Sequence, residues 1–240
     1  MSNILLAGDS WGIGVFAGVG ENYGPTGQGI QSNLEAQGHS VINISKAGIS
    51  NENIINNISE NLQMVDHVIF LQTDIFRNNS YHGVKGIEPS WRWLREEFIS
   101  ELLNFSSLHD YIDNYFELLY TKLDSIAKLR NQKILCIGGW SDIHPCINKF
   151  DNLEVLIPSA TQLLIPEVKE QVYISDGEYF IQLNDNVKFM NKFDYEIKKI
   201  SVNSLYKSEK SCKKWNDVHP DIYGYTRIVD SILLYLAKKY

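Results

Sequence analysis

The chain has 240 residues, 44% of them hydrophobic and 21% charged, and 22 Lys and Arg against 29 Asp and Glu give a formal net charge of −7. That length suits one large domain or two small ones, and the apolar fraction excludes an intrinsically disordered chain. The acidic balance argues against a protein that chiefly binds nucleic acid, because that affinity comes from clustered Lys and Arg side chains. Composition therefore indicates a soluble globular protein and leaves its function to the motifs.

The amino-terminal segment carries no basic residue before its first apolar run. That run, Ile4 to Ala7, is too short for a signal peptide or a membrane span. We therefore expect a cytoplasmic protein without a membrane-spanning segment. The three cysteines, Cys136, Cys146 and Cys212, are an odd number without CxxC spacing, which favours reduced thiols over disulfides or a zinc site.

Short apolar runs alternate with amphipathic stretches along most of the chain. In chain order, the hydrophobic periodicity predicts a strand at 3–7, a helix at 28–37, a strand at 41–45, a helix at 51–64, a strand at 66–72, a helix at 111–129, a strand at 133–137 and a helix at 222–239. Strands that alternate with helices indicate a parallel sheet covered on both faces. We therefore predict one α/β domain spanning residues 1–240.

Two segments do not fit this alternation. Residues 76–95 are rich in Asn, Gly, Ser and aromatic residues, and we predict a loop insertion there, near the carboxyl ends of the strands. Long loops in compact domains often serve as lids or binding loops. Residues 141–182 are ambiguous between strands and helix.

Polar residues directly follow the first predicted strand, in the sequence Gly8-Asp9-Ser10-Trp11. In an open parallel sheet, ligands bind at the carboxyl ends of the strands, and a serine there is a nucleophile if a base reaches it. Gly, Asp and Ser are also the ordinary residues of turns and helix caps, so this segment alone favours a turn.

Three further polar segments follow the second strand, end the third strand and precede the last helix. They are Lys46-Ala47-Gly48-Ile49-Ser50-Asn51, Gln72-Thr73-Asp74 and Trp215-Asn216-Asp217-Val218-His219-Pro220. In order and context, the four segments resemble the motif blocks of the SGNH, or GDSL, hydrolase family. The resemblance implies a three-layer α/β/α sandwich with a central parallel, flavodoxin-like sheet, and a serine hydrolase that uses no metal or cofactor.

The resemblance also implies catalytic roles for individual residues. Ser10 corresponds to the nucleophile, and His219 to the general base that takes its proton. The family places an orienting Asp three residues before the His, where this chain has Asn216. We assign the orienting role to Asp217, one position nearer, because a carboxylate stabilises an imidazolium better than an amide does.

The oxyanion hole is where the chain departs from the family. By resemblance, the backbone N–H groups of Ser10 and Gly48 donate to the oxyanion, and an Asn side chain is the third donor. Here Asp74 stands in that position, and an ionised carboxylate only accepts hydrogen bonds. A protonated Asp74, or a donor from Arg77 or Thr73, would restore the missing hydrogen bond.

A second Asp-x-His-Pro segment, Asp142-Ile143-His144-Pro145, follows the strand predicted at 133–137. His144 competes with His219 for the role of base, although a simple turn ending at Pro145 is the favoured interpretation. A metal site combining Asp142, His144 and His219 has no ligand-spacing motif behind it. The candidate pocket residues around Ser10 are Asp9, Trp11, Asn51, Thr73, Arg77, His144 and Asn216.

We therefore expect a serine esterase that hydrolyses or transfers an O-acyl group, such as acetyl from a carbohydrate, through a covalent acyl-enzyme. Its partner would be a small-molecule or carbohydrate ester, without nucleic acid. The alternative is a catalytically weak or inactive module of the same fold that binds a glycan or another ligand. Asp74 and Asn216 favour the alternative, because both depart from the family at catalytic positions, whereas Ser10 and His219 favour the enzyme.

Overall fold

The fold is described from a computed structural model of the chain. It describes residues 1–14, 29–61, 64–73, 108–139, 142–160, 163, 172–175, 178–183, 186–190, 220 and 222–238. The insertion predicted at 76–95 lies outside these residues. The single-domain organisation of residues 1–240 stays a prediction.

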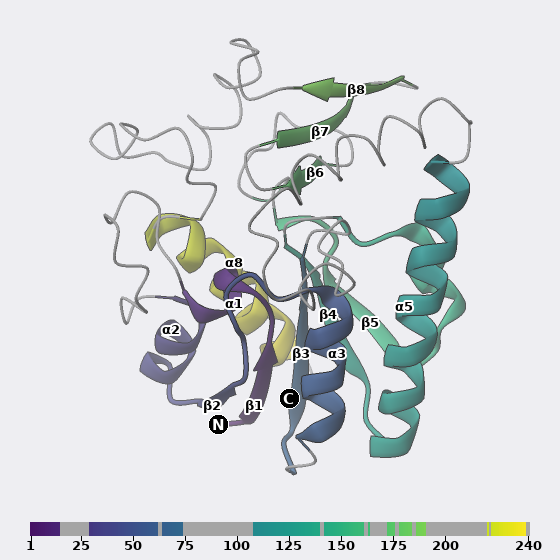
Figure 1. Cartoon of the computed structure of the whole chain (residues 1–240). Helices are drawn as coiled ribbons and strands as arrows, with labels where there is room; N and C mark the ends of the chain where they lie inside the picture. Colours follow the sequence, from purple (N-terminus) through teal and green to yellow (C-terminus); the bar gives the residue numbers. More distant parts are fainter. Residues whose placement is uncertain are drawn as a thin grey trace, which may run out of the picture.

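A five-stranded parallel sheet forms the centre of the structure, with the strand order β2-β1-β3-β4-β5 (Figure 1). Its strands are β1 (Asn3–Ala7), β2 (Ser40–Asn43), β3 (His67–Gln72), β4 (Ile134–Gly138) and β5 (Leu153–Ile157). This order is that of a doubly wound, flavodoxin-like sheet. The three middle strands, β1, β3 and β4, are almost entirely buried, which explains their unbroken apolar sequences.

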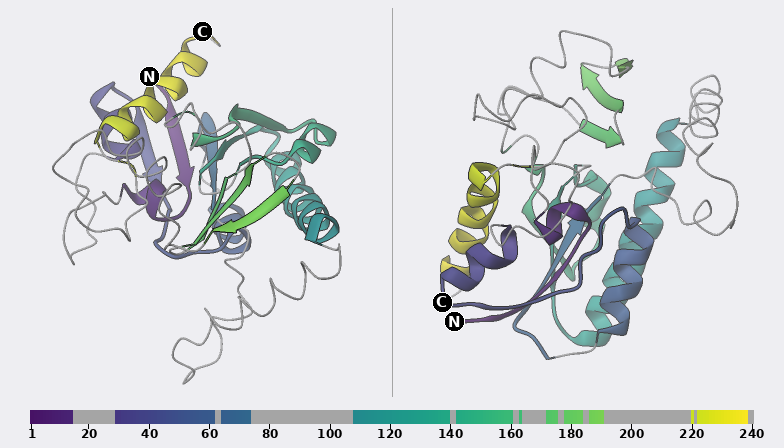
Figure 2. Two further views of the ribbon diagram at one scale, coloured as in Figure 1. Left: turned by 90° about the horizontal axis from the view of Figure 1, so that it is seen from above. Right: turned by 60° about the vertical axis from the view of Figure 1, so that its left-hand side comes forward.

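Helices cover both faces of the sheet (Figures 1 and 2). On one face lie α1 (Ser10–Ile13), α2 (Ile30–Ala36) and α8 (Ile222–Lys238), and on the other lie α3 (Asn51–Glu60) and α5 (Leu108–Arg130). The predicted three-layer α/β/α sandwich with a central parallel sheet is therefore confirmed.

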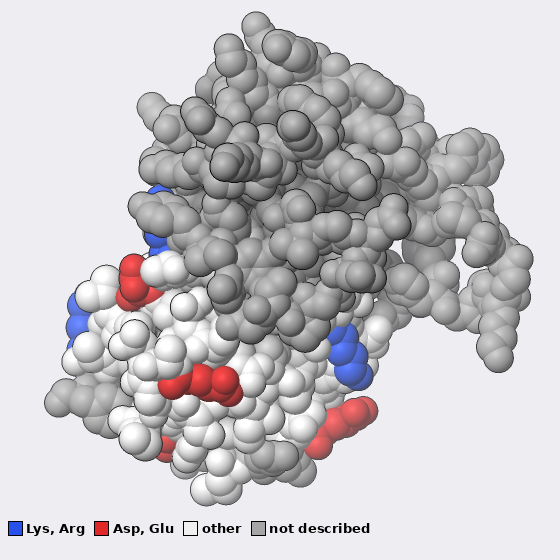
Figure 3. Space-filling model, turned by 90° about the vertical axis from the view of Figure 1, so that its left-hand side faces the viewer, with Lys and Arg blue, Asp and Glu red and all other residues white. Residues whose placement is uncertain are grey.

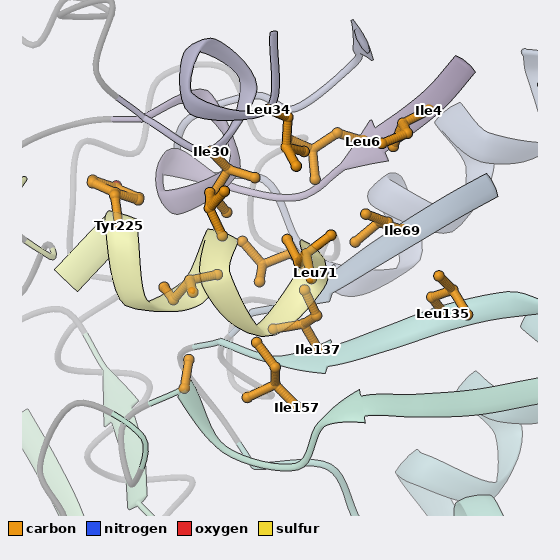
Figure 4. Close-up of a cluster of buried hydrophobic side chains, with 14 of the residues drawn as sticks. Ile4, Leu6, Ile30, Leu34, Ile69, Leu71, Leu135, Ile137, Ile157 and Tyr225 are labelled. Carbon is orange, nitrogen blue, oxygen red and sulfur yellow. The ribbon is translucent and has the colours of Figure 1, made fainter. Parts of the chain in front are cut away.

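Each face of the sheet has its own hydrophobic core, because successive side chains of a strand point to opposite faces. Leu6, Ile69 and Ile137 pack with residues of α2 and α8 in the cluster drawn in Figure 4. Their chain neighbours Phe70 and Cys136 pack on the other face against α3 and α5.

The predicted elements are present, with ends shifted by a few residues. The helix predicted at 111–129 extends over 108–130, and the helix predicted at 51–64 ends at Glu60.

The ambiguous stretch 141–182 contains the 3₁₀ helix η2 (Pro145–Lys149), β5 and the start of a separate antiparallel sheet. That sheet has the order β6-β7-β8 and lies beyond the carboxyl ends of the parallel strands (Figures 1 and 2): β6 (Val172–Ser175), β7 (Glu178–Leu183) and β8 (Asn186–Met190).

On the face shown in Figure 3, Lys and Arg side chains lie apart from one another and form no basic patch among the described residues. Within the described ranges, no helix combines the length and apolarity that crossing a membrane requires. Cys136 and Cys146 are free thiols, and burial raises the pKa of Cys146 to about 11, so its thiolate form is disfavoured at neutral pH.

Candidate active site

The candidate site lies where β1 and β3 end side by side. Ser10 is the first residue of α1 and follows β1, while Thr73 directly follows β3. The helix α1, which follows β1, lies on the α1–α2–α8 face of the sheet, whereas α5, which is the next described helix after β3, lies on the other face. This reversal between β1 and β3 is the topological switch point, the preferred ligand site of open α/β sheets.

The turn that carries Ser10 is held by backbone and carboxyl contacts. The Asp9 side chain is fully buried and accepts a hydrogen bond from the Trp11 N–H at 3.0 Å, which caps α1. Gly14 ends the helix at φ 87°, and a Cβ added there would lie 2.7 Å from the Cα of Gly29. Only glycine tolerates both that backbone conformation and that close approach. Ser10 itself is 6% exposed.

Trp11, a candidate pocket residue, lies elsewhere. Its side chain is fully buried in the core between the sheet and α8. The structure therefore places Trp11 in the hydrophobic core and away from a ligand-accessible surface. A large aromatic residue four positions after a strand fits either role, and only the packing of α8 decides between them.

Gly48 lies in the exposed turn that follows β2. Its φ of 70° is in the left-handed region, so the turn requires glycine for its backbone conformation. The N–H of Lys46 donates to the carbonyl of Gly8 at 3.1 Å, which holds the start of this turn beside the end of β1. Within the part of the chain that the structure describes, the Gly48 N–H forms no hydrogen bond. That N–H group is available to a ligand.

Thr73 is bound on three sides inside the protein. Its hydroxyl donates to Asp9 Oδ2 at 2.6 Å, and its backbone N–H donates to Asn51 Oδ1 at 2.8 Å. Its carbonyl accepts a hydrogen bond from Asn51 Nδ2 at 3.1 Å. Asp9, Asn51 and Thr73 are all 0% exposed. Since both hydrogens that Thr73 can donate are used here, Thr73 does not supply the missing oxyanion donor.

The side-chain amide of Asn51 also forms its hydrogen bonds inside the protein. Besides the two bonds to Thr73, its Nδ2 also donates to the Tyr115 hydroxyl at 3.1 Å. Both amide hydrogens therefore have partners, one on Thr73 and one on α5. The structure places Asn51 beneath the site and away from any pocket surface, so its amide does not replace the Asn that the family has at the position of Asp74.

Gln72 was not a candidate in the sequence analysis, yet it organises the other side of the site. Its Nε2 donates to the carbonyl of Asp142 at 2.7 Å, and its Oε1 accepts from the Tyr120 hydroxyl at 2.9 Å. That hydroxyl also accepts from the His144 N–H at 3.0 Å. The only signal in the sequence was a Gln at the end of an apolar strand, because a buried amide needs hydrogen-bond partners.

His144 faces α5. Its Nε2 lies 3.0 Å from Asp113 Oδ1, its Nδ1 accepts from the Cys146 N–H at 3.4 Å, and its ring stacks on Phe116 at a centroid distance of 5.0 Å. Burial lowers the pKa of His144, while the Asp113 carboxylate opposes that effect. Because Nδ1 accepts a hydrogen bond, the imidazole is neutral and carries its hydrogen on Nε2. The bond from the Cys146 N–H to Nδ1 also caps η2. The structure therefore favours the turn interpretation over a base for Ser10.

The remaining candidates lie outside the described residues: Asp74, Arg77, Asn216, Asp217 and His219. Their relation to Ser10 stays a prediction. Pro220, which follows His219, is buried, and α8 begins two residues later against the face that also carries α1. Among the described residues, no three His, Cys, Asp or Glu side chains gather in a way that would hold a metal ion.

Comparison with known proteins finds likenesses at the level of solved structures. No protein-family model matches the sequence, and no curated protein matches it. A structure of a protein named TesA is similar, with 12% identity, 98% of this chain and 97% of that chain covered, and a TM-score of 0.49. A member of the lipolytic G-D-S-L protein family from Veillonella parvula has 14% identity, coverage of 97% and 96%, and a TM-score of 0.40.

A third similar structure is that of a possible lipase from Chitinophaga pinensis. It has 12% identity, coverage of 99% of this chain and 98% of that chain, and a TM-score of 0.45. The fold itself follows from the strand order and the two helical layers described above.

Proposed function

We propose that the protein is a serine esterase of the SGNH, or GDSL, type, which cleaves an O-acyl ester through a covalent acyl-enzyme. The observation that supports it most is the location of Ser10 at the first turn of α1, at the switch point between β1 and β3. The neighbouring carboxyl of Asp9 is turned inward by its two hydrogen bonds and does not compete for the substrate.

In the proposed reaction, Ser10 Oγ attacks the ester carbonyl carbon while His219 takes the hydroxyl proton. The C–O bond to the alcohol then breaks, and His219 returns the proton to the leaving oxygen. Water, activated by the same imidazole, attacks the acyl-enzyme and releases the acid and free Ser10. Asp217 orients His219 and stabilises its charged form.

The negative oxygen of the tetrahedral intermediates requires donors. We propose the backbone N–H groups of Ser10 and Gly48, of which the Gly48 N–H has no partner among the described residues. Because Thr73 donates both its hydrogens internally, it is not the third donor. We propose that Asp74, at the position where the family has Asn, is an ionised acceptor and leaves the oxyanion with these two donors.

Replacing Asp74 by Asn is expected to raise kcat, by up to about 10²-fold, because one oxyanion donor is worth about 10²–10³ in rate. The value of KM should change little, since the donor acts mainly in the transition state. The Asp74→Leu variant separates the effect of losing the carboxylate from the effect of gaining a donor, because it removes the carboxylate without adding a donor. A fall in kcat for Asp74→Asn would instead show that the carboxylate has a task of its own.

Labelling with a fluorophosphonate probe tests the proposed function directly. We expect the folded protein to be labelled at Ser10, located by peptide mass spectrometry, and to hydrolyse 4-nitrophenyl acetate. A folded protein that is neither labelled nor active would favour the alternative, a module that binds a glycan or another ligand. The proposed substrates are small-molecule or carbohydrate esters, and acetyl is the first acyl group to test.

A further inference from the structure

We infer that Thr73 is a positioning residue for Ser10, and that Asn51 holds Thr73 in place. This inference rests on the proposed esterase and adds two residues that act without touching the substrate. Asp9, Asn51 and Thr73 come from the segments that follow β1, β2 and β3, and they meet beneath the site.

The link from Thr73 to the nucleophile runs through Asp9. One carboxyl oxygen of Asp9 accepts from the Thr73 hydroxyl at 2.6 Å, and the other accepts from the Trp11 N–H at 3.0 Å. Asp9 and Trp11 flank Ser10 in the chain, so the orientation of this carboxyl sets the backbone that carries Ser10. The carboxyl is fully buried, where losing a hydrogen-bond partner is costly and forces the side chain to turn.

The link from Thr73 to the rest of the fold runs through Asn51. The amide of Asn51 binds the backbone of Thr73 as a neighbouring strand would, accepting from its N–H and donating to its carbonyl. The bond from Asn51 Nδ2 to the Tyr115 hydroxyl fixes which way the amide faces. Asn therefore suits this position, whereas a carboxylate would lose the donor to the Thr73 carbonyl.

The end of β3 is also held from its opposite side. Gln72 binds the carbonyl of Asp142 and the hydroxyl of Tyr120, which places Thr73 between two sets of buried hydrogen bonds. A segment bound on both sides has little freedom to adjust when one bond is lost. Since a misplacement of about 1 Å can cost about 10² in rate, loss of the Thr73 hydroxyl should appear in kcat.

Thr73→Val and Thr73→Ser form the decisive comparison. Val keeps the shape of Thr and removes the hydroxyl, whereas Ser keeps the hydroxyl. For 4-nitrophenyl acetate, we expect Thr73→Val to lower kcat about 10- to 100-fold with KM within about threefold of the wild type. Thr73→Ser should stay within about threefold of the wild-type kcat, and the rate of Ser10 labelling by fluorophosphonate should follow kcat.

Thr121→Val is the matched control, because Thr121 donates its hydroxyl to the Glu117 carbonyl on the exposed side of α5. It should leave kcat unchanged. If Thr73→Val does not fold, Asn51→Asp takes its place: it keeps the acceptor for the Thr73 N–H, removes the donor to the Thr73 carbonyl, and should lower kcat with KM preserved.

The outcomes separate this inference from the proposed function. A wild type that is neither active nor labelled overturns the proposed function and this inference with it. An active wild type with an equally active Thr73→Val, or with Thr73→Ser as impaired as Thr73→Val, overturns the inference alone.

Discussion

Replacing Ser10 by Ala is expected to lower kcat/KM for 4-nitrophenyl acetate by at least about 10³-fold, because removing the nucleophile of a serine hydrolase leaves only binding and oxyanion stabilisation. The change deletes one oxygen at the first residue of α1, a position that Ala accepts without loss of helix geometry. The midpoint of thermal unfolding should therefore stay near that of the wild type. The same variant should lose its reaction with fluorophosphonate.

Ser45→Ala is the matched control for this experiment. Ser45 lies in the neighbouring segment after β2, and its buried hydroxyl has no hydrogen-bond partner within the described ranges. Its removal breaks no hydrogen bond among the described residues and should leave kcat/KM within about twofold of the wild type. Equal rates for wild type and Ser10→Ala would exclude the proposed mechanism.

Replacing Phe70 by Ala should cost about 3–5 kcal/mol in the free energy of unfolding, the range for a buried Phe that is truncated to Ala. Phe70 lies in β3, is 0% exposed, and packs in the core between the sheet, α3 and α5. The core there is built from rigid strands and long helices, which limits how far it can collapse around the cavity. Urea denaturation followed by circular dichroism measures the change.

Leu129→Ala is the control for the stability measurement. Leu129 lies near the end of α5 and is 88% exposed. Its truncation should change the free energy of unfolding by no more than about 0.5 kcal/mol. If Phe70→Ala lowers the free energy of unfolding by less than about 1 kcal/mol, the result would contradict the two-core architecture described for this sheet, because truncating a buried Phe usually destabilises a protein by more than that.

The strands were predictable because each is a short apolar run bounded by polar or turn residues. β1, β3 and β4 lie in the middle of the sheet and are buried on both faces, so their sequences are continuously apolar. Helix ends were less accurate, as at α3, where the helix ends at Glu60 although apolar residues continue the pattern to Met64. The backbone of Asn61 leaves the helical conformation, with φ −97° and ψ 83°, and its side-chain amide donates to the Asn57 carbonyl at 2.7 Å. Hydrophobic periodicity does not show such a cap.

Ser10 and Gly48 were predictable as site candidates, because strand ends are visible in the sequence and ligand sites of parallel sheets lie there. The roles of Trp11, Asn51 and Thr73 were not. All three stood as pocket candidates, and the structure places them in the interior. Their residue types suit a pocket as well as a core, and the partners that decide between these roles are distant in the chain.

The sequence by itself therefore determined the succession of β1 to β4 with α2, α3, α5 and α8, the two-sided burial of the central strands and the location of Ser10 near a strand end. These properties depend on local periodicity and on the residues adjacent to each strand. Only the tertiary structure decided that the Thr73 hydroxyl donates to Asp9 and that the Thr73 N–H donates to Asn51. Thr73 lies 64 residues from Asp9 along the chain, and a hydrogen bond over that separation exists only once β1 and β3 pair in register.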